Sequence, residues 1–224
     1  MKLVSVNVGL PRLITWQGET FETGIFKDPV VGRERVLLRA TNLDGDRQAD
    51  LTVHGGPNKA VYAYPSEHYA PWKAELHKPD LTWGAFGENF TTTGLLETSV
   101  SIGDHYRLGS AVIAVTTPRL PCFKLAAKFK SERIIAQFLR SGRSGFYFSV
   151  VKEGEVGAGD DFQLLEREDP TLTIAEVNGI YSDKSPDRET LQRSLLVKSL
   201  PLSWRYRFQE RLKDLDNEVD HQHR

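Results

Sequence analysis

Residues 111–125 read AVIAVTTPRLPCFKL and contain the change of pattern that decides the fold. The first six residues are mainly Val, Ile and Ala, which is typical of a buried β-strand. Pro118 and Pro121 then interrupt the chain, and from Cys122 to Leu139 apolar residues recur at helical spacing. We therefore predict a strand that ends at a proline-rich turn, followed by one helix over residues 122–139 that Gly142 terminates.

Short runs of strand character, separated by Gly, Pro and Asp turns, extend along the chain as far as Leu164. They include residues 3–8, 35–40, 60–64, 111–116 and 145–151. This pattern predicts a mainly β fold with helices (α+β), in which residues 1–168 form a small curved sheet or barrel.

The character of the chain changes after the charged run at residues 166–170, which ends in proline and is typical of a linker. Three amphipathic segments follow, at residues 173–181, 187–198 and 202–215, and Ser185 is placed to cap the second. Such helices bury their apolar stripes against one another or against the sheet. We predict that residues 169–224 form a small three-helix domain with a polar tail.

The composition sets limits on function. Lys and Arg number 29 and Asp and Glu 30, a balance that provides no net field for binding a nucleic-acid polymer. Residues 1–7 lack the apolar core of a secretory signal, and no run is long enough to span a membrane. The single cysteine excludes an internal disulfide and a self-contained iron–sulfur cluster, and it fits a reducing compartment. We expect a cytoplasmic protein.

Cys122 is the leading candidate for chemistry. Pro121 in a first helical turn would place the thiol beside unpaired backbone N–H groups, while Arg119 and Lys124 add positive charge nearby. These effects favour the thiolate, which is the form that reacts or binds a metal. The alternative is a buried cysteine that only fills space, as lone cysteines often do. The flanking prolines and cations favour the reactive interpretation.

Three further segments combine glycines with polar side chains. In residues 54–59, Gly55 and Gly56 allow a ligand to approach the backbone, and His54 and Lys59 can donate hydrogen bonds to a phosphate or carbonyl oxygen. A tight turn with solvent-facing polar groups explains this segment equally well.

In residues 84–90, Asn89 can bind the edge of a heterocycle, although a turn that Glu88 and Asn89 satisfy locally is favoured when the segment is taken alone. In residues 141–147, Arg143 offers a planar fork for phosphate or carboxylate, or is simply an exposed connection between a helix and a strand. Three histidines have no ligand-like spacing and are expected to be surface or locally bonded residues: His68, His77 and His105.

Together these four segments resemble the MOSC family, named after the C-terminal domain of molybdenum cofactor sulfurases. The matching residues are His54-Gly55-Gly56 with Lys59, Gly87-Glu88-Asn89, Pro118-Arg119 with Pro121-Cys122, and Gly142-Arg143 with Gly145 and Tyr147. The tract VHGGPNKAVYAYPSEHY at residues 53–69 and the C-terminal helices are most similar to the YiiM-type members, so the resemblance covers nearly the whole chain. Arg47, Thr117 and Phe146 depart from residues that are common in the family.

The resemblance implies a MOSC β-barrel followed by a three-helix domain, with a molybdenum cofactor (molybdopterin carrying one molybdenum) in a basic cleft and Cys122 as the protein ligand of the metal. It also implies reduction of N-hydroxylated compounds, such as 6-hydroxylaminopurine, hydroxylamines and amidoximes, by two-electron cleavage of the N–O bond to give amine and water. On this basis catalytic roles are expected for Cys122, Lys59 and Asn89. Cofactor binding is expected for His54, Gly55, Gly56, Glu88, Arg119, Lys124, Arg143 and Tyr147.

Electrons must then come from another protein, because the sequence shows no dinucleotide-binding fingerprint, no evident flavin module and too few cysteines for a cluster. We expect a separate reductase, of flavoprotein type. The C-terminal helices are candidates for its dock, and packing or homodimer formation explains them at least as well. The alternative function is a non-enzymatic carrier of molybdenum cofactor, or of a persulfide on Cys122. A nucleotide-binding module without molybdenum is a third.

Overall fold

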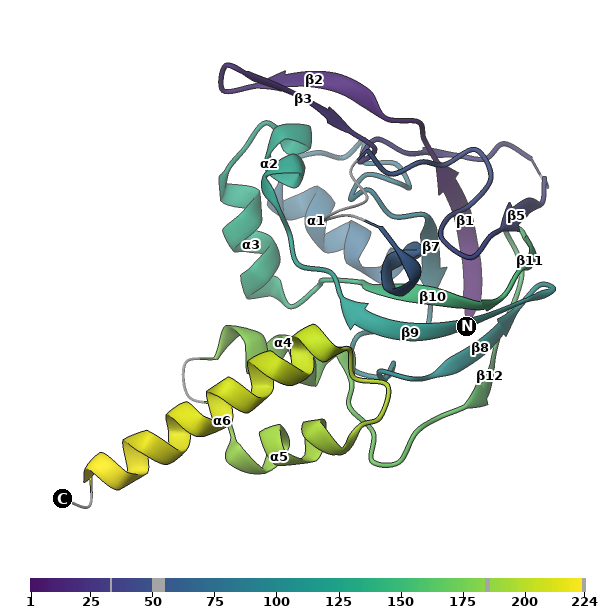
Figure 1. The fold of residues 1–224 in the computed structure, drawn as a ribbon. Coiled ribbons are helices and arrows are strands. Elements are labelled where there is room, and N and C mark those ends of the chain that lie inside the picture. The colour runs from purple at the N-terminus through teal and green to yellow at the C-terminus, as the bar shows by residue number, and fades with distance from the viewer. Residues whose placement is uncertain (33, 50–54, 184–185, 223–224) are drawn as a thin grey trace.

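The computed structural model describes residues 1–32, 34–49, 55–183 and 186–222. Its main sheet is built from β1 (Lys2–Val8), β4 (Asp28–Pro29), β6 (Val61–Pro65), β7 (Phe90–Thr93), β8 (His105–Leu108), β9 (Ala111–Pro118), β10 (Phe146–Lys152) and β12 (Phe162–Glu166). The spatial order is β12-β8-β9-β10-β6-β7-β1-β4 (Figure 1). Neighbouring strands are antiparallel except β6 and β7, which are parallel.

The sheet curls until distant strands meet. Lys2 in β1 forms an isolated antiparallel bridge with Asp161, immediately before β12. The Leu3 N–H donates to the Asp160 carbonyl at 2.9 Å, and the Gly159 N–H donates to the Leu3 carbonyl at 2.7 Å. These contacts confirm the predicted curved sheet, in the form of a half-closed barrel.

Smaller elements surround this half-barrel. β2 (Arg12–Trp16) and β3 (Glu19–Thr23) form a projecting hairpin, and β5 (Val36–Leu38) pairs with β11 (Gly154–Val156) (Figure 1). The 3-10 turns η1 (Pro57–Lys59) and η2 (Ser66–His68) flank β6, and α1 (Tyr69–Glu75) follows η2.

The prediction of a single helix over residues 122–139 is wrong. The structure has two helices, α2 (Phe123–Phe129) and α3 (Arg133–Ser141), because Lys130 adopts a left-handed conformation with φ 53° and breaks the first. The apolar spacing continues across the break since both helices pack on one aromatic cluster around Trp72 and Phe86. Gly142, with φ 65°, ends α3 as predicted.

The three predicted C-terminal helices are present as α4 (Ile174–Ser182), α5 (Arg188–Leu196) and α6 (Leu202–Gln222), the last continuing well beyond its predicted end. Thr173 and Glu176 form a reciprocal capping box that starts α4. Asp187 caps α5 by accepting a hydrogen bond from the Thr190 N–H at 2.8 Å, whereas Ser185 lies outside the described residues.

The C-terminal helices share a core with the barrel. Val177, Trp204 and Phe208 belong to the same apolar cluster as Tyr106 and Phe148 from the sheet. The helical layer therefore lies in a defined position against β9 (Figure 1). A division into domains at residue 168 stays a prediction. Within the described ranges, none of the helices has both the length and the apolar character that crossing a bilayer requires.

Candidate functional site

The site is built around the turn that follows β9. After Pro118 the chain leaves the sheet, and the Arg119 N–H donates to the Gly145 carbonyl at 3.3 Å. Cys122 is the N-cap of α2, with an extended backbone (φ −131°, ψ 173°), so Pro121 precedes the helix and does not occupy its first turn as predicted. Cys122 is only partly buried and lines two adjoining cavities.

The first of these, called here the basic cavity, encloses about 110 Å³. Five of its described lining residues are cations and one is a carboxylate: Lys27, Arg47, Lys59, Arg119 and Lys124, against Asp46. Cys122, Asn89 and Tyr147 also line it. The predicted residues Lys59, Arg119, Cys122, Lys124 and Tyr147 are thus brought together, and their excess positive charge suits a polyanionic ligand.

Arg119 has an unusual environment in this cavity. Its side chain is buried, the residue being 6% exposed, and its guanidinium lies 4.8 Å from the Tyr62 ring centroid and 5.4 Å from that of Phe138. Its Nη1 has no hydrogen-bond partner among the described residues. A buried donor left in this state costs roughly 1–3 kcal/mol. A ligand with an acceptor at this point would remove that cost.

Arg119 also remains charged. Burial works to lower its pKa, but attraction to Tyr62, Tyr147 and Cys122 outweighs burial and leaves the pKa above its ordinary value. Burial raises the pKa of the Tyr147 phenol, which therefore stays a neutral hydrogen-bond donor. Cys122 thus shares the cavity with a buried cation and a neutral hydroxyl.

Lys27 and Asp46 form part of the wall that sequence reasoning missed. The buried Asp46 carboxylate is in very close contact with Lys27 Nζ and accepts hydrogen bonds from the Gly9 N–H and Asn89 Nδ2, both at 2.9 Å. Burial lowers the pKa of Lys27, although Asp46 opposes this. No local motif marks these residues, because only the fold brings the segments after β3 and after β5 to the cavity that Cys122 lines.

Asn89, predicted to be catalytic, lines the basic cavity with its amide already engaged. Besides the bond to Asp46, its Oδ1 accepts from the Tyr62 N–H at 3.2 Å and its Nδ2 approaches the Asn7 carbonyl at 3.3 Å. These bonds join β1, β6 and the loop before β7. In this structure the Asn89 amide holds the wall of the cavity.

Gly55, Gly56 and Lys59 form a rim, of which Gly55 and Lys59 line both cavities and Gly56 lines the second cavity. Gly55 and Gly56 have φ values of 109° and 80°, and nothing lies within 4 Å of a Cβ built on Gly56. A ligand can therefore approach this backbone closely. Lys59 ends η1 and lines both cavities. His54, the fourth predicted residue of this segment, lies outside the described residues.

Glu88 and Arg143 do not line either cavity, in contrast to their predicted cofactor-binding roles. The fully buried Glu88 carboxylate accepts the N–H groups of Gly84 at 2.8 Å and Phe86 at 3.1 Å, and so folds its own loop. Arg143 donates to both carboxylate oxygens of Glu75, at 2.8 and 2.7 Å, and lies 4.1 Å from the Trp72 ring centroid. Their polar groups are therefore used inside the protein.

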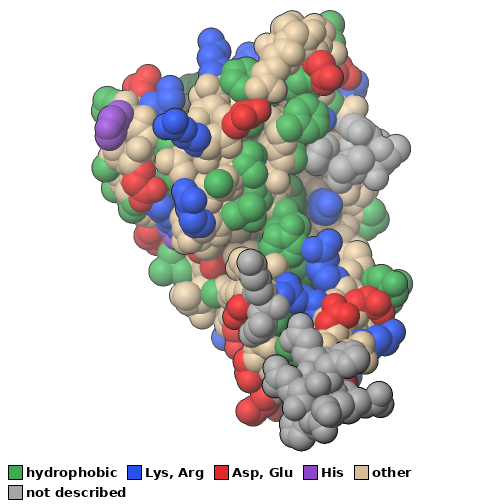
Figure 2. Space-filling view, turned by 90° about the vertical axis from the view of Figure 1, so that its left-hand side faces the viewer, with side chains coloured by type: hydrophobic (Ala, Val, Ile, Leu, Met, Phe, Trp, Pro, Cys, Tyr) green, Lys and Arg blue, Asp and Glu red, His purple; other side chains and the backbone are tan. Residues whose placement is uncertain are grey.

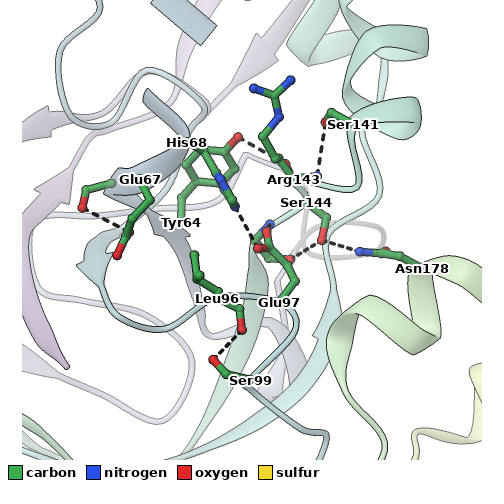
Figure 3. Close-up of polar contacts among 12 residues, drawn as sticks. Tyr64, Glu67, His68, Leu96, Glu97, Ser99, Ser141, Arg143, Ser144 and Asn178 are labelled. Atoms are coloured by element: carbon green, nitrogen blue, oxygen red, sulfur yellow. Dashed lines mark hydrogen bonds and ion pairs between the residues drawn. The ribbon is translucent and has the colours of Figure 1, made fainter. Parts of the chain in front are cut away.

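A second polar cluster lies on the other side of residues 143–145 (Figure 3). His68 Nε2 lies 2.8 Å from Glu97 Oε2, and Glu97 Oε1 accepts the Gly145 N–H at 2.7 Å. Asn178 of α4 donates to Ser144 Oγ at 2.8 Å, which ties the helical layer to this cluster. His77 and His105 contact the backbone carbonyls of Ala74 and Gly103. The prediction of local bonding is confirmed for His77 and His105, whereas the partner of His68 lies 29 residues away in the sequence.

The second cavity, called here the helix-side cleft, encloses about 550 Å³. It lies between the rim residues, the turn at residues 117–122 and the start of α6. In Figure 2, Lys and Arg side chains gather where the larger upper body meets the C-terminal helices below. Cys122 therefore lies where a small basic cavity meets a larger cleft.

Comparisons with known proteins agree on one family. A family model described as "MOSC domain" matches residues 50–163. The chain is 41% identical over 209 residues to the uncharacterized protein YflK of Bacillus subtilis (strain 168), covering 93% of both chains. It is 36% identical over 178 residues to YiiM of Escherichia coli (strain K12), covering 79% of both.

Two further similarities bear on the fold and on the type of activity. The structure of YiiM from Geobacillus stearothermophilus is similar with a TM-score of 0.77 and 36% identity, covering 94% of this chain and 98% of that one. A Gibberella moniliformis (strain M3125 / FGSC 7600) protein named "Reductase" is 41% identical over 148 residues, which are 65% of this chain and 26% of that protein.

Proposed function

Because the chain belongs to the MOSC domain family, whose members are related to the molybdenum cofactor, we propose that it is a molybdenum-cofactor-dependent reductase of N-hydroxylated compounds. One observation supports this most directly. A partly buried cysteine and a buried arginine with an unpartnered N–H line the same basic cavity. A polyanionic cofactor that binds metal needs both groups.

The residues of the basic cavity fit such a cofactor. Its phosphate group would be held by Arg119, Lys124 and Arg47, and its pterin would lie against the backbone at Gly55. Cys122 would supply one sulfur ligand, and thiolates select soft transition metals such as molybdenum. When bound, the cofactor supplies the two-electron step that removes oxygen from nitrogen.

The chain's own residues would bind the substrate and manage protons. Reduction of R–NHOH to R–NH2 and water takes two electrons and two protons. Tyr147 keeps its phenol proton and can donate a hydrogen bond to the departing oxygen. Lys59, at the junction of the two cavities, can donate a second. Arg119 attracts the thiolate of Cys122 and so favours metal binding.

We infer that the electrons come from a separate reductase. The fungal relative named "Reductase" matches this chain over only a quarter of its own length, so a domain of this type also occurs inside a longer reductase chain. In the present protein such a reductase would be a partner. A cytoplasmic location would suit this chemistry.

The test is turnover by purified holoprotein, made with molybdate available and supplied with a chemical reductant. We expect conversion of 6-hydroxylaminopurine or benzamidoxime to the corresponding amine or amidine, and a Cys122→Ala variant should retain neither molybdenum nor activity. The alternative, a carrier of cofactor or persulfide, would be favoured if the protein holds molybdenum and pterin but reduces no N-hydroxylated compound. Metal analysis that finds no molybdenum would contradict the reductase and the cofactor carrier, and would leave only the persulfide carrier.

A further inference from the structure

The helix-side cleft has a wall that the family's barrel does not provide. Its barrel side includes Cys122 and Lys59. Its far side is made by Pro201, which precedes α6, and by three residues from the start of α6: Ser203, Trp204 and Arg207. A cleft of about 550 Å³ is in the size range that holds small organic ligands. The C-terminal helices thus complete a ligand-sized space that reaches Cys122.

The lining of this cleft selects a particular chemistry. Among its described lining residues the charged ones are Lys59 and Arg207, and both are cations. Several others are apolar, and they include Leu120, the edge of Trp204 and prolines from both walls. Aromatic and proline surfaces suit a ligand with a flat apolar ring system. Cations with no carboxylate among the described lining residues suit a ligand that also carries an anionic group.

Arg207 is exposed and lies near two aromatic rings, and the described residues do not engage its hydrogen-bond donors. Its guanidinium lies 5.0 Å from the Tyr181 ring centroid and 6.0 Å from that of Trp204, and within the described chain no hydrogen bond or ion pair engages it. Two neighbouring arginines on α6 behave differently. Arg205 donates to the Val197 carbonyl at 2.7 Å, and Arg211 donates to the Ile180 carbonyl at 2.8 Å. Arg207 therefore offers a planar fork whose donors are open to a ligand.

We propose that the helix-side cleft is the substrate site and that Arg207 binds an anionic group, phosphate or carboxylate, on an aromatic N-hydroxylated substrate. This inference rests on the proposed function, because Cys122 marks the end of the cleft that the N–O group must reach. The flat body of the substrate lies between Leu120 and Trp204, with its anionic group at α6. The anionic group takes no part in the reaction, and external reductant supplies the electrons.

The test compares two substrates that differ in one charge. Holoprotein with reduced methyl viologen is assayed with benzamidoxime and with 4-carboxybenzamidoxime. We expect a lower KM for the carboxylated compound, and Arg207→Gln should raise that KM roughly tenfold, the effect of one charge-assisted hydrogen bond. Its kcat, and both constants for benzamidoxime, should change little. Arg207→Lys should recover part of the loss.

Lys213→Gln is the matched control, since Lys213 is an exposed cation on the same helix whose ion pair is with Glu210. It should leave both substrates unaffected. A second pair, N6-hydroxyadenosine and its 5′-monophosphate, distinguishes phosphate from carboxylate as the preferred anion. If Arg207→Gln affects neutral and anionic substrates equally, or neither, the cleft does not recognise an anion and the proposal is wrong.

Failure of the proposed function would look different. If wild-type holoprotein reduces none of these compounds, binding is measured directly by ligand-observed NMR with 4-carbamoylbenzoate and benzamide as probes. Preferential binding of the carboxylate that Arg207→Gln abolishes would support the anion site without the reductase activity. Equal binding of both probes, or no binding, would contradict the anion site.

Discussion

Gly145 separates two polar regions that differ in one respect. Its carbonyl accepts the Arg119 N–H on the side of the basic cavity, and its own N–H donates to Glu97 on the side of the His68 cluster. In the His68 cluster both carboxylate oxygens of Glu97 have partners. In the basic cavity, by contrast, the side-chain Nη1 of Arg119 is buried and has no partner among the described residues.

This difference separates groups that serve the fold from groups that await a ligand. A buried polar group normally has a partner, so a satisfied cluster needs no further explanation. An unsatisfied cation beside a partly buried cysteine is costly and calls for one. The same criterion distinguishes Arg143, whose Nη2 donates to Glu75 and whose guanidinium lies by the Trp72 ring, from Arg119.

The largest expected effect comes from disturbing Gly145, which both regions share. Gly145 has φ 60°, and a Cβ built there would lie 2.3 Å from the Ala63 carbonyl oxygen. We expect Gly145→Ala to lower the free energy of unfolding by about 3 kcal/mol or more, because both the backbone conformation and the contact are unfavourable. Urea denaturation measures this. Gly142→Ala, at a glycine with φ 65° and open space around its Cβ, is the control and should cost clearly less.

Arg119→Met separates ligand binding from folding. It removes a buried charge that lacks a full set of partners, so we expect the unfolding free energy of the apoprotein to stay the same or to rise. Molybdenum and pterin retained per protein should fall by roughly a hundredfold, about 2.7 kcal/mol at 25 °C. Arg143→Met should have the opposite effects: the protein should retain its molybdenum and pterin, and its free energy of unfolding should fall. A variant at Arg119 that is strongly destabilised yet binds cofactor normally would contradict the comparison.

These two arginines also show what the sequence can predict. The strand over residues 111–116, the stop at Gly142 and the three C-terminal helices follow from local patterns, and the structure has all of them. Arg119 and Arg143 look alike as basic residues next to glycine or proline, and their different roles depend on Glu75, Tyr62 and Phe138, which come from distant segments. Lys27 and Asp46 reach the cavity only through the fold, and the apolar spacing runs past the break at Lys130 because both helices pack on one aromatic cluster.

Glu97→Ala tests the His68 cluster, in which the carboxylate of Glu97 has hydrogen-bond partners for both oxygens. It leaves the Gly145 N–H and the His68 ring without their acceptor, and we expect a loss of about 1–3 kcal/mol in the free energy of unfolding, measured by urea denaturation. Glu97→Gln keeps an acceptor for the Gly145 N–H and should recover much of this. Cofactor content per folded molecule should be unchanged in both variants. A loss of cofactor without a loss of stability would show that the His68 cluster belongs to the site.

The most gradual effect, spread over several pH units, is a pH dependence from Lys128, a buried cation that donates to carbonyls. Its Nζ donates to the carbonyls of Ile25 at 2.9 Å and Gly84 at 2.7 Å, and burial, with Arg119 among the nearby cations, lowers its pKa to about 7. The unfolded chain keeps the ordinary value of 10.5 and therefore binds more protons than the folded protein between pH 7 and 10.5. The penalty for burying Lys128 is thus complete below pH 7 and shrinks as the pH rises.

Comparing wild type with Lys128→Met isolates this contribution, since Lys27 and the other shifted groups are present in both proteins. Relative to the variant, wild type should gain stability on going from pH 7 to pH 9, with a slope that cannot exceed about 1.4 kcal/mol per pH unit. Urea denaturation at half-unit steps measures the difference. A difference that is constant with pH would mean that Lys128 stays charged when buried. In that case carbonyl partners alone would suffice to keep a buried cation, and the open N–H of Arg119 would lose its value as the mark of a ligand site.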